Sequence, residues 1–325
     1  MRNSVGNGTA DLLHNLRHPL VRDLAWCVFS SPLVHSPPYC DSEQIEPDQS
    51  DVDYFLDLER APDDLLDWMS YQMPRRLGLR FERFWQFWLT QRHPESAIEH
   101  RFNLQIQNGD RTLGELDCVS LNTDRHQLIH RELAVKFYLG IHSDRLPENF
   151  RPPTSRCWVG ANVSDRLDLK CKQMFQRQMR WLERPEARKS LPPDWTFDHL
   201  QKRAITRGRL FYPSEWPPDA ADGFPVHSQH QRGQWLTVKA LESTPGDAWL
   251  ILAREHWFAE RVLEDSRQIL GLDNLVARVR QQLQHTFQPL QVIRLDWSDG
   301  LWREQQRIFV VPDQWPATAT PLRRT

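Results

Sequence analysis

The residues whose types and spacing could do chemistry are acidic side chains and one lysine. Asp117 lies two residues after Glu115, and Lys136 lies four residues after Glu132. Mg²⁺ prefers oxygen ligands and is commonly held by one or two carboxylates together with waters and substrate phosphates. A lysine beside such a site can stabilise the negative charge that develops on a phosphate. These residue types therefore point to metal-assisted hydrolysis of a phosphodiester bond.

Three predicted strands position these residues. The Asn108-Gly109 dipeptide predicts a hairpin between the first two strands, and a polar connection leads to the third. Because side chains alternate between the two faces of a strand, the two acidic residues of the second strand share a face, as do Glu132 and Lys136. We expect an antiparallel meander whose second and third strands present carboxylates and a lysine. The alternating patterns cover residues 102–107, 112–121 and 128–139.

Two predicted helices flank the strands and carry further polar candidates. The first covers residues 77–89, and its apolar stripe has Glu82 at the edge, where a partly desolvated carboxylate needs a partner. The second covers residues 165–182 and can be capped by the preceding serine. Gln178 shares the apolar face of this second helix, and Lys170 is one of its basic residues. We expect both helices to pack against the meander.

The motifs resemble those of a known group of proteins. The sequence is similar to a bacterial family of uncharacterised proteins, a domain of unknown function that is grouped with the PD-(D/E)xK nuclease-like superfamily. The similarity extends over most of the chain, whereas the nuclease-like motifs lie within about residues 77–182. The segments that carry it are Val21-Arg22-Asp23-Leu24-Ala25-Trp26, Arg80-Phe81-Glu82, Gly114-Glu115-Leu116-Asp117 and Glu132-Leu133-Ala134-Val135-Lys136-Phe137-Tyr138-Leu139.

The resemblance implies a Mg²⁺-dependent nuclease that acts on DNA or RNA. By position, Asp117 would be the metal-binding aspartate of the hairpin, Lys136 the catalytic lysine of the third strand, and Glu82 the glutamate of the first helix. Gln178 or Lys170 would be the polar residue that the following helix supplies to the substrate. A second carboxylate ligand would come from Glu115 or Glu132.

One position departs from the superfamily pattern. An acidic residue is expected two residues before the lysine, and Ala134 occupies that position. Glu132 lies four residues before Lys136, so in a regular strand their Cα atoms would be roughly 13 Å apart, twice the usual separation of about 6.6 Å. The alternative is therefore a non-catalytic nucleic-acid-binding or scaffold protein that retains a degenerate nuclease-like fold.

The order of elements predicts an α/β protein with a restriction-endonuclease-like central mixed sheet, flanked by helices and followed by an α+β C-terminal extension. Residues 1–76 are expected to form a helical segment, with a helix at 11–30 and one or two helices at 55–73, of which Pro62 would start the second, and residues 77–190 the nuclease-like core. Residues 191–325 are either a separate α+β region or continuous with the core. Strands are expected there at 209–212, 234–241, 248–253, 291–296 and 306–311, and a helix at 272–283.

Charge is unevenly distributed along the chain. Lys+Arg number 41 and Asp+Glu 43, which gives a formal net charge of −2. Residues 1–70 hold 13 acidic and 4 basic residues, whereas residues 165–210 hold 12 basic and 6 acidic residues. The basic segment can contact the phosphates of DNA or RNA. It can equally be a solvated helix face that balances the acidic N-terminal part, and charge alone leaves both interpretations open.

Composition and missing motifs exclude several other classes. Hydrophobic residues make up 39% of the chain and charged residues 26%, which is typical of a globular protein with a sizeable core. The longest stretch without a formal charge, Leu24–Cys40, is too short and too polar to span a bilayer. The 5 cysteines form no CxxC pair, and GxxxxGK[ST], GxGxxG, GxSxG and HExxH are all missing. These observations favour a cytoplasmic protein without a membrane partner, and they leave its oligomeric state open.

Overall fold

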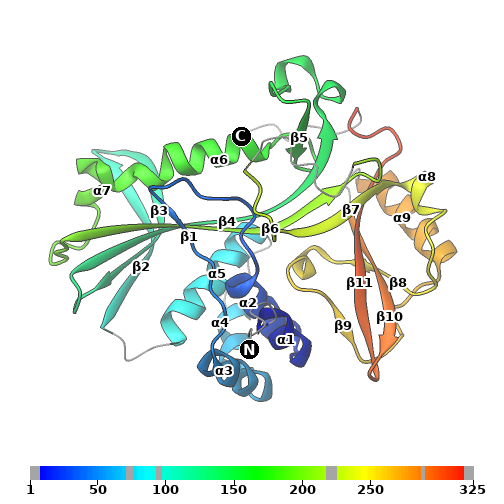
Figure 1. Ribbon diagram of the computed structural model, residues 1–325, viewed down its shortest axis with the longest axis horizontal. Coiled ribbons are helices and arrows are strands. Elements are labelled where there is room, and N and C mark those ends of the chain that lie inside the picture. Colours follow the sequence, from blue (N-terminus) through cyan, green and yellow to red (C-terminus); the bar gives the residue numbers. More distant parts are fainter. Residues whose placement is uncertain (1–7, 71–75, 93–96, 217–224, 287–289, 318–325) are drawn as a thin grey trace, which may run out of the picture. The chain divides into compact units, whose positions relative to one another are not determined.

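The computed structural model describes five stretches of the chain, residues 8–70, 76–92, 97–216, 225–286 and 290–317. They form a mixed α/β structure with a large mixed β-sheet flanked by helices, as the sequence predicts (Figure 1). The chain divides into two compact units, each made of two segments. Unit 1 comprises Met1–Val135 and Cys171–Arg207, and unit 2 comprises Lys136–Lys170 and Gly208–Thr325. Two long strands, β4 (Gln127–His142) and β6 (His199–Tyr212), run from one unit into the other.

The N-terminal part of unit 1 is helical. The prediction of one helix over residues 11–30 is wrong, because the helix is broken before Pro19, which begins a second helix at its first position. Proline suits that position because its missing N–H would have no partner within the helix. Asp48 and Asp51 form a capping box at the start of the third helix. The helices are α1 (Gly8–Asn15), α2 (Pro19–Phe29), α3 (Gln49–Arg60), α4 (Asp63–Ser70) and α5 (Leu77–Gln91).

The predicted hairpin and third strand are present in unit 1. Strands β2 (Ile98–Asn108) and β3 (Arg111–Asn122) pair in antiparallel register, and Gly109 has the positive φ of 59° that the tight turn requires. Strand β3 pairs with β4, and the sheet order in this unit is β2-β3-β4-β6, with β1 (Asp41–Ser42) parallel to β6. Strand β6 begins ten residues earlier than predicted, because its first half is polar and gives no apolar alternation.

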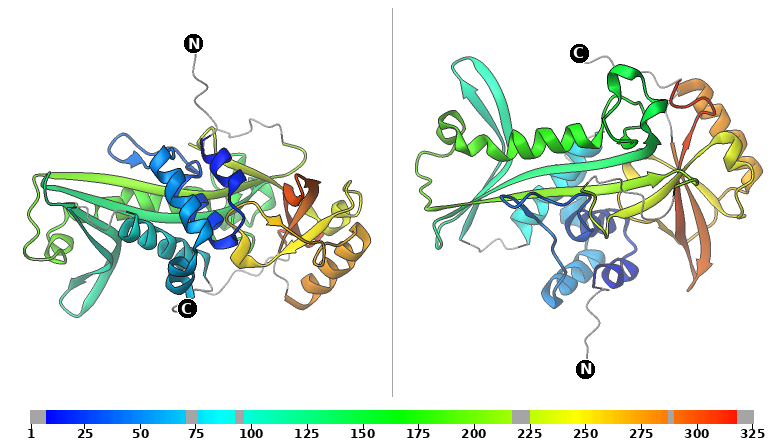
Figure 2. Two further views of the ribbon diagram at one scale, coloured as in Figure 1. Left: turned by 90° about the horizontal axis from the view of Figure 1, so that it is seen from below. Right: turned by 45° about the horizontal axis from the view of Figure 1, so that its top comes forward.

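Helices lie on both faces of the unit 1 sheet. Figure 1 shows α5 on one face and α7 (Pro185–Lys189) on the other, and the second view of Figure 2 agrees. The 3₁₀ helix η3 (Gln178–Glu183) packs with α7 on the hairpin, where Trp181, Leu182 and Ala187 join apolar residues of β2 and β3. A β-carbon at Gly114 would lie 2.5 Å from Cζ2 of Trp181. Glycine at this position therefore lets the indole rest directly on strand β3.

The predicted helix over residues 165–182 is interrupted. The α-helix α6 covers Leu167–Gln176 only, and Arg177 has φ −121° and ψ −62° before the tighter η3 begins. An apolar period cannot distinguish a continuous helix from an α-helix followed by a 3₁₀ turn, since both keep side chains three or four residues apart on one side. The interruption places Gln178 at the first position of η3.

Unit 2 holds the remaining strands. Its sheet order is β6-β7-β11-β10-β8, in which β6, β7 and β11 are parallel and β11, β10 and β8 are antiparallel. The predicted strand at 234–241 ends at Thr237, whose hydroxyl accepts a hydrogen bond from Ala240 N and caps helix α8. The elements are η1 (Ser143–Arg145), η2 (Glu148–Phe150), β5 (Arg156–Val159), β7 (Gln231–Thr237), α8 (Val238–Leu241), β8 (Trp249–Leu252), η4 (Arg254–His256), β9 (Val262–Leu263), α9 (Leu272–Thr286), β10 (Leu290–Ser298) and β11 (Leu301–Val311).

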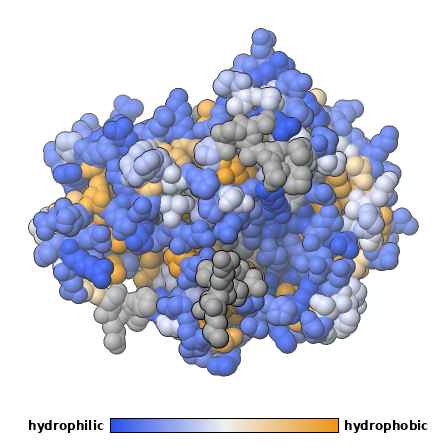
Figure 3. Space-filling model, viewed as in Figure 1, coloured by the Kyte–Doolittle hydropathy of each residue, from blue (hydrophilic) through white to orange (hydrophobic). Residues whose placement is uncertain are grey.

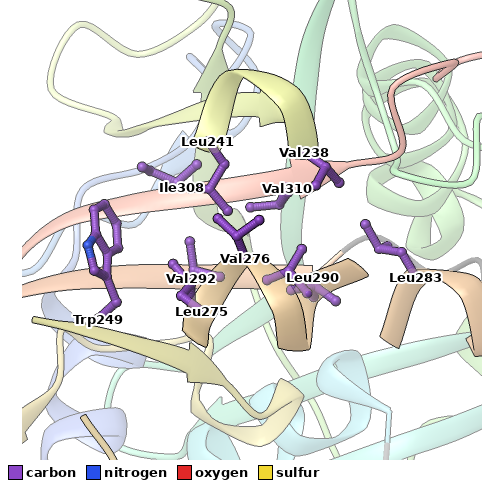
Figure 4. Close-up of a cluster of buried hydrophobic side chains, with 11 residues drawn as sticks. Val238, Leu241, Trp249, Leu275, Val276, Leu283, Leu290, Val292, Ile308 and Val310 are labelled. Carbon is purple, nitrogen blue, oxygen red and sulfur yellow. The ribbon is translucent and has the colours of Figure 1, made fainter. Parts of the chain in front are cut away.

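The core of unit 2 lies between α9 and the β10–β11 hairpin. Leu275 and Val276 of α9 face Val292 of β10 and Val310 of β11, and α8 adds Leu241 (Figure 4). The predicted helical period of residues 272–283 is confirmed by this packing.

The close approach of strands β4 and β6 in unit 2 depends on a glycine. Gly208 has φ 143°, and a β-carbon there would overlap the backbone oxygen of Lys136. Strand β6 can therefore approach β4 only because residue 208 lacks a side chain.

No helix within the described residues is both long enough and apolar enough to cross a membrane. In the view of Figure 3, hydrophilic residues cover most of the visible surface and hydrophobic residues form separate patches.

Candidate functional site

The predicted acidic residues of unit 1 lie along a row where the β-ladder opens. Strands β3 and β4 pair up to Cys118↔Arg131, and the next position of β3 is Asp117. Its carboxylate Oδ2 accepts a hydrogen bond of 2.8 Å from the backbone N of Leu133, and thus takes the place of a ladder partner. Asp117 is partly exposed, so this end of the ladder is accessible to solvent.

The neighbouring strand supplies a fully buried carboxylate. Glu132 is 0% exposed, its Oε1 lies 2.9 Å from Nε2 of His130, and its Oε2 accepts a 2.6 Å hydrogen bond from Nε2 of Gln178. Gln178 reaches it from η3, the segment at which α6 is interrupted. The structure thus brings together two residues that were predicted separately from the sequence, Glu132 and Gln178.

His130 is part of this cluster, although no specific role for it is evident from the sequence. It is 0% exposed, and burial lowers the pKa of His130 to about 4, against an opposing effect of the nearby Asp117. The imidazole is therefore neutral at neutral pH. Its Nδ1 has no hydrogen-bond partner among the residues that the structure describes. Its position two residues before Glu132, on the same face of the strand, was the sequence signal for this contact.

Glu82 and Glu115 are joined through an asparagine that the sequence patterns did not indicate. Nδ2 of Asn103 lies 2.9 Å from Oε1 of Glu115 and 3.4 Å from Oε2 of Glu82, while Oδ1 accepts a 3.0 Å hydrogen bond from Gln86. Asn103 has a positive φ of 53°, a conformation that asparagine tolerates better than most residues. A strand pattern does not reveal such a local distortion.

The two clusters meet at neighbouring positions of the sheet. Residue pairs Phe102↔Cys118 and Leu104↔Leu116 place Asn103 opposite Asp117, and this position is missing from the regular register. A regular continuation of the β3–β4 register would place Asp117 opposite Glu132. Asn103, Asp117 and Glu132 therefore form one polar row of neighbouring positions across β2, β3 and β4, and the ladder is disrupted on both sides of Asp117. The contacts of the row lie on different faces of the sheet, because Asn103 meets Glu82 of α5 whereas Glu132 meets Gln178 of η3.

The two predicted lysines lie in unit 2. Nζ of Lys136 is 2.6 Å from Oδ2 of Asp165, and the hydroxyl of Tyr138 donates to the same oxygen at 2.8 Å. The side chains of Lys136 and Asp165 are 30% and 39% exposed. Asp165 follows the strands in a loop, so nothing in the sequence marked it as the partner. Lys170 is a partly exposed residue of α6.

The carboxylates do not fit a preformed Mg²⁺ site as they are arranged. Among the described residues, no group of three or more His, Cys, Asp or Glu side chains is placed to hold a metal ion. Both oxygens of Glu115 accept hydrogen bonds from the amides of Asn103 and Gln105, and one oxygen of Asp117 accepts from backbone N–H. A metal ion would have to displace these donors before the carboxylates could bind it.

Comparison with known proteins adds a family match. The family model with the description "Domain of unknown function (DUF1853)" matches residues 22–311, which is most of the chain. No curated protein and no solved structure matches this chain.

Proposed function

The chain belongs to the DUF1853 family, and from this premise we propose that it binds nucleic acid through the phosphate backbone, on a restriction-endonuclease-like fold whose nuclease centre is degenerate. The observation that carries the proposal is a run of exposed cations in unit 1. Residues 171–190 contain six basic and two acidic side chains. All six basic side chains are exposed: Lys172, Arg177, Arg180, Arg184, Arg188 and Lys189.

Two of these cations are held in place by an aromatic ring. The guanidinium groups of Arg177 and Arg184 lie 5.5 Å and 4.8 Å from the ring centroid of Trp181. Trp181 is itself buried on strand β3 against Gly114. Cation–π contacts restrict the guanidinium groups without neutralising their charge. Ordered cations on a rigid support lose less entropy when they bind phosphate groups.

The polar row supports the non-catalytic form of the proposal. Ala134, at the position where the PD-(D/E)xK pattern has an acidic residue, is buried at 8% exposure. Glu132 is enclosed by His130 and Gln178. A carboxylate that is already hydrogen-bonded and buried gains less from binding a metal, because protein donors already satisfy its oxygens.

Salt dependence of binding tests the proposal. We expect DNA and RNA duplexes to bind with an affinity that falls steeply as salt increases, independently of sequence. The triple variant Lys172→Ala/Arg184→Ala/Lys189→Ala should weaken binding and reduce the slope of log K against log salt by about 2–3, roughly one for each phosphate that is no longer neutralised. Fluorescence anisotropy at several salt concentrations measures both quantities.

A matched triple variant of unit 2 is the control. Arg254, Arg278 and Arg280 are also exposed, and one of them likewise lies over an indole ring, 5.5 Å from the centroid of Trp257. Replacing these three by alanine removes the same charge and should leave the salt slope unchanged. Equal losses of affinity in the two triple variants would mean that nucleic acid does not bind preferentially at residues 171–190, and the proposal would fail.

A metal-dependent nuclease of the PD-(D/E)xK type is the second candidate. It is favoured by the row of Asn103, Asp117 and Glu132 across an opened ladder, together with the contact of Gln178 to Glu132. Asp117 is a partly exposed carboxylate in this row, and Mg²⁺ prefers oxygen ligands.

Cleavage of DNA and RNA with Mg²⁺ or Mn²⁺ separates the two candidates. The nuclease candidate expects cleavage that Asp117→Ala and Lys136→Ala each abolish. Cleavage that both variants retain would rule out these residues as its centre. Binding without cleavage, in the presence of either metal, would favour the non-catalytic candidate.

A further inference from the structure

Unit 2 contains a polar pocket beside the start of β7 and the middle of the parallel strand β11. Strands β7 and β11 pair from Gln234↔Ile308 onward, and the pocket lies around the residues that precede this pairing. Its volume is about 450 Å³, within the range of small-molecule sites. Figure 1 shows β7 and β11 in this part of the fold.

The floor of the pocket is built from two buried arginines. Arg307 is 3% exposed and donates to both oxygens of Glu304, and also to the backbone oxygens of Trp257 and Ala259. Arg209 is also 3% exposed and donates to Glu260 at 2.6 Å and to Gln231 at 3.0 Å. These contacts fix both guanidinium groups, so the floor is rigid.

Arg209 retains an unsatisfied donor. Its Nε is buried and has no hydrogen-bond partner within the part of the chain that the structure describes. Burial lowers the pKa of Arg209, and the neighbouring positive charge of Arg307 lowers it further, against the opposing carboxylates of Glu260 and Glu304. A further anion near this pair of guanidinium groups would therefore be stabilised.

The rim of the pocket is polar and partly exposed. Arg232 is exposed, and its guanidinium lies 5.0 Å from the ring centroid of Tyr212. Nε2 of Gln306 donates a 2.8 Å hydrogen bond to Oε1 of Gln234, which leaves the second amide hydrogen of Gln306 and both amide hydrogens of Gln234 for other acceptors. The lining as a whole carries three guanidinium groups and two carboxylates, so its formal charge is positive.

We propose that this pocket binds a small polar molecule through an oxyanion group, a phosphate or a carboxylate. Arg232 pairs with the oxyanion at the rim, and the amides of Gln234 and Gln306 donate hydrogen bonds to its oxygens. The buried arginine pair supplies the positive potential beneath. This site uses residues of unit 2 only, and it is independent of the nucleic-acid contacts proposed for unit 1.

Calorimetric titration of the full chain with inorganic phosphate and with malonate tests the proposal. We expect saturable binding of one or both probes, and their relative affinities distinguish a phosphate from a carboxylate ligand. Arg232→Ala should weaken binding about tenfold or more, as expected for the loss of one charge-assisted hydrogen bond. Gln306→Ala should weaken it by a smaller factor, because it removes only a neutral donor.

The control is Arg278→Ala, which removes an exposed arginine of α9 outside the pocket. It should bind the probe with unchanged affinity, and circular dichroism should show that all three variants are folded. The proposal is overturned if neither probe saturates the protein. It is also overturned if the Arg278 variant loses as much affinity as the Arg232 variant.

Discussion

Two buried glutamates of unit 1 are held in different ways. Glu43 is 7% exposed and accepts hydrogen bonds from Arg131 Nε at 3.1 Å and Arg203 Nη1 at 2.5 Å. Glu132 is 0% exposed and is held by an amide and by an imidazole that is neutral at neutral pH. Arg131 lies between His130 and Glu132 on β4, so successive residues of one strand serve the two clusters.

The difference separates a structural carboxylate from a candidate functional one. Burial alone would raise the pKa of Glu43, but the guanidinium groups of Arg131 and Arg203 overcome this effect and lower it. Glu43 is therefore an anion that joins β4 and β6 to the segment that follows β1. Glu132, at the opened ladder, depends on donors that come from its own strand and from η3. The hydrogen bond from Gln178 makes the environment of Glu132 depend on the position of η3, whereas Arg131 and Arg203, the partners of Glu43, lie on the neighbouring strands β4 and β6.

The largest expected effect is the removal of the anion in the structural cluster. Glu43→Ala leaves buried Arg131 without its carboxylate, so we expect the free energy of unfolding at pH 7 to fall by about 3–5 kcal/mol. Because the pKa of Glu43 is lowered by folding, its contribution is present above the pKa of the unfolded chain and is lost as pH falls through the lower folded value. Urea unfolding at pH 7 and at acidic pH measures both effects.

Glu46→Ala is the matched control for this prediction. Glu46 is exposed, and the amide of Gln44 donates to it at 3.1 Å. Its removal should change the free energy of unfolding by no more than about 0.5 kcal/mol. Equal effects of the two substitutions would contradict the distinction between a structural and a surface carboxylate.

The second prediction concerns the histidine of the candidate site. His130 has a pKa of about 4 when folded, against 6.5 for the free side chain, so the unfolded chain binds a proton first as pH falls. The free energy of unfolding should therefore decrease between pH 6.5 and 4, by about 3 kcal/mol for this group, and level off below.

His130→Gln removes this titration and should flatten the pH dependence of stability. His100 and His230 also have pKa values lowered by burial to about 4, so part of the slope should remain. Urea unfolding of the wild type and the variant at several pH values measures the difference. An unchanged slope would mean that His130 is not buried as a neutral group.

The third prediction concerns the attachment of η3, which carries Gln178 to Glu132. Gly114→Ala would place a methyl group 2.5 Å from the indole of Trp181, and we expect a loss of about 1–3 kcal/mol as the ring is displaced. Urea unfolding followed by tryptophan fluorescence measures the loss. Gly78→Ala in α5 is the control, because no atom lies within 4 Å of its β-carbon position, and it should stabilise the helix by about 0.5–1 kcal/mol.

The smallest effect is expected at the lysine of unit 2. Lys136→Met breaks the ion pair with Asp165, in which both side chains are about one-third exposed. Solvent screens such pairs, so the free energy of unfolding should fall by no more than about 1 kcal/mol. A loss comparable to that of Glu43→Ala would place Lys136 among the structural residues. A small loss in stability combined with loss of cleavage would instead favour the nuclease candidate.

Much of the fold followed from local patterns. The Asn108-Gly109 turn, the strands on either side of it and the helices at 77–91 and 272–286 depend on turn chemistry and on hydrophobic period, which neighbouring residues determine. An apolar pattern that continues across a change of backbone geometry does not reveal the change. For this reason the pattern did not predict the interruptions at Pro19 and Arg177 or the helical turn after Thr237.

The sequence by itself determined the order of these elements and the strands that carry the candidates, with Glu115 and Asp117 on β3 and Glu132 and Lys136 on β4, because strand patterns depend on residue spacing along the backbone. Tertiary structure decided which partners reach these residues from outside their own strands. Gln178 reaches Glu132 from a segment that is distant in sequence, and Asp165 reaches Lys136 from a loop. Hydrogen bonds form where folding brings atoms within about 3 Å, and no period in the sequence encodes such distances.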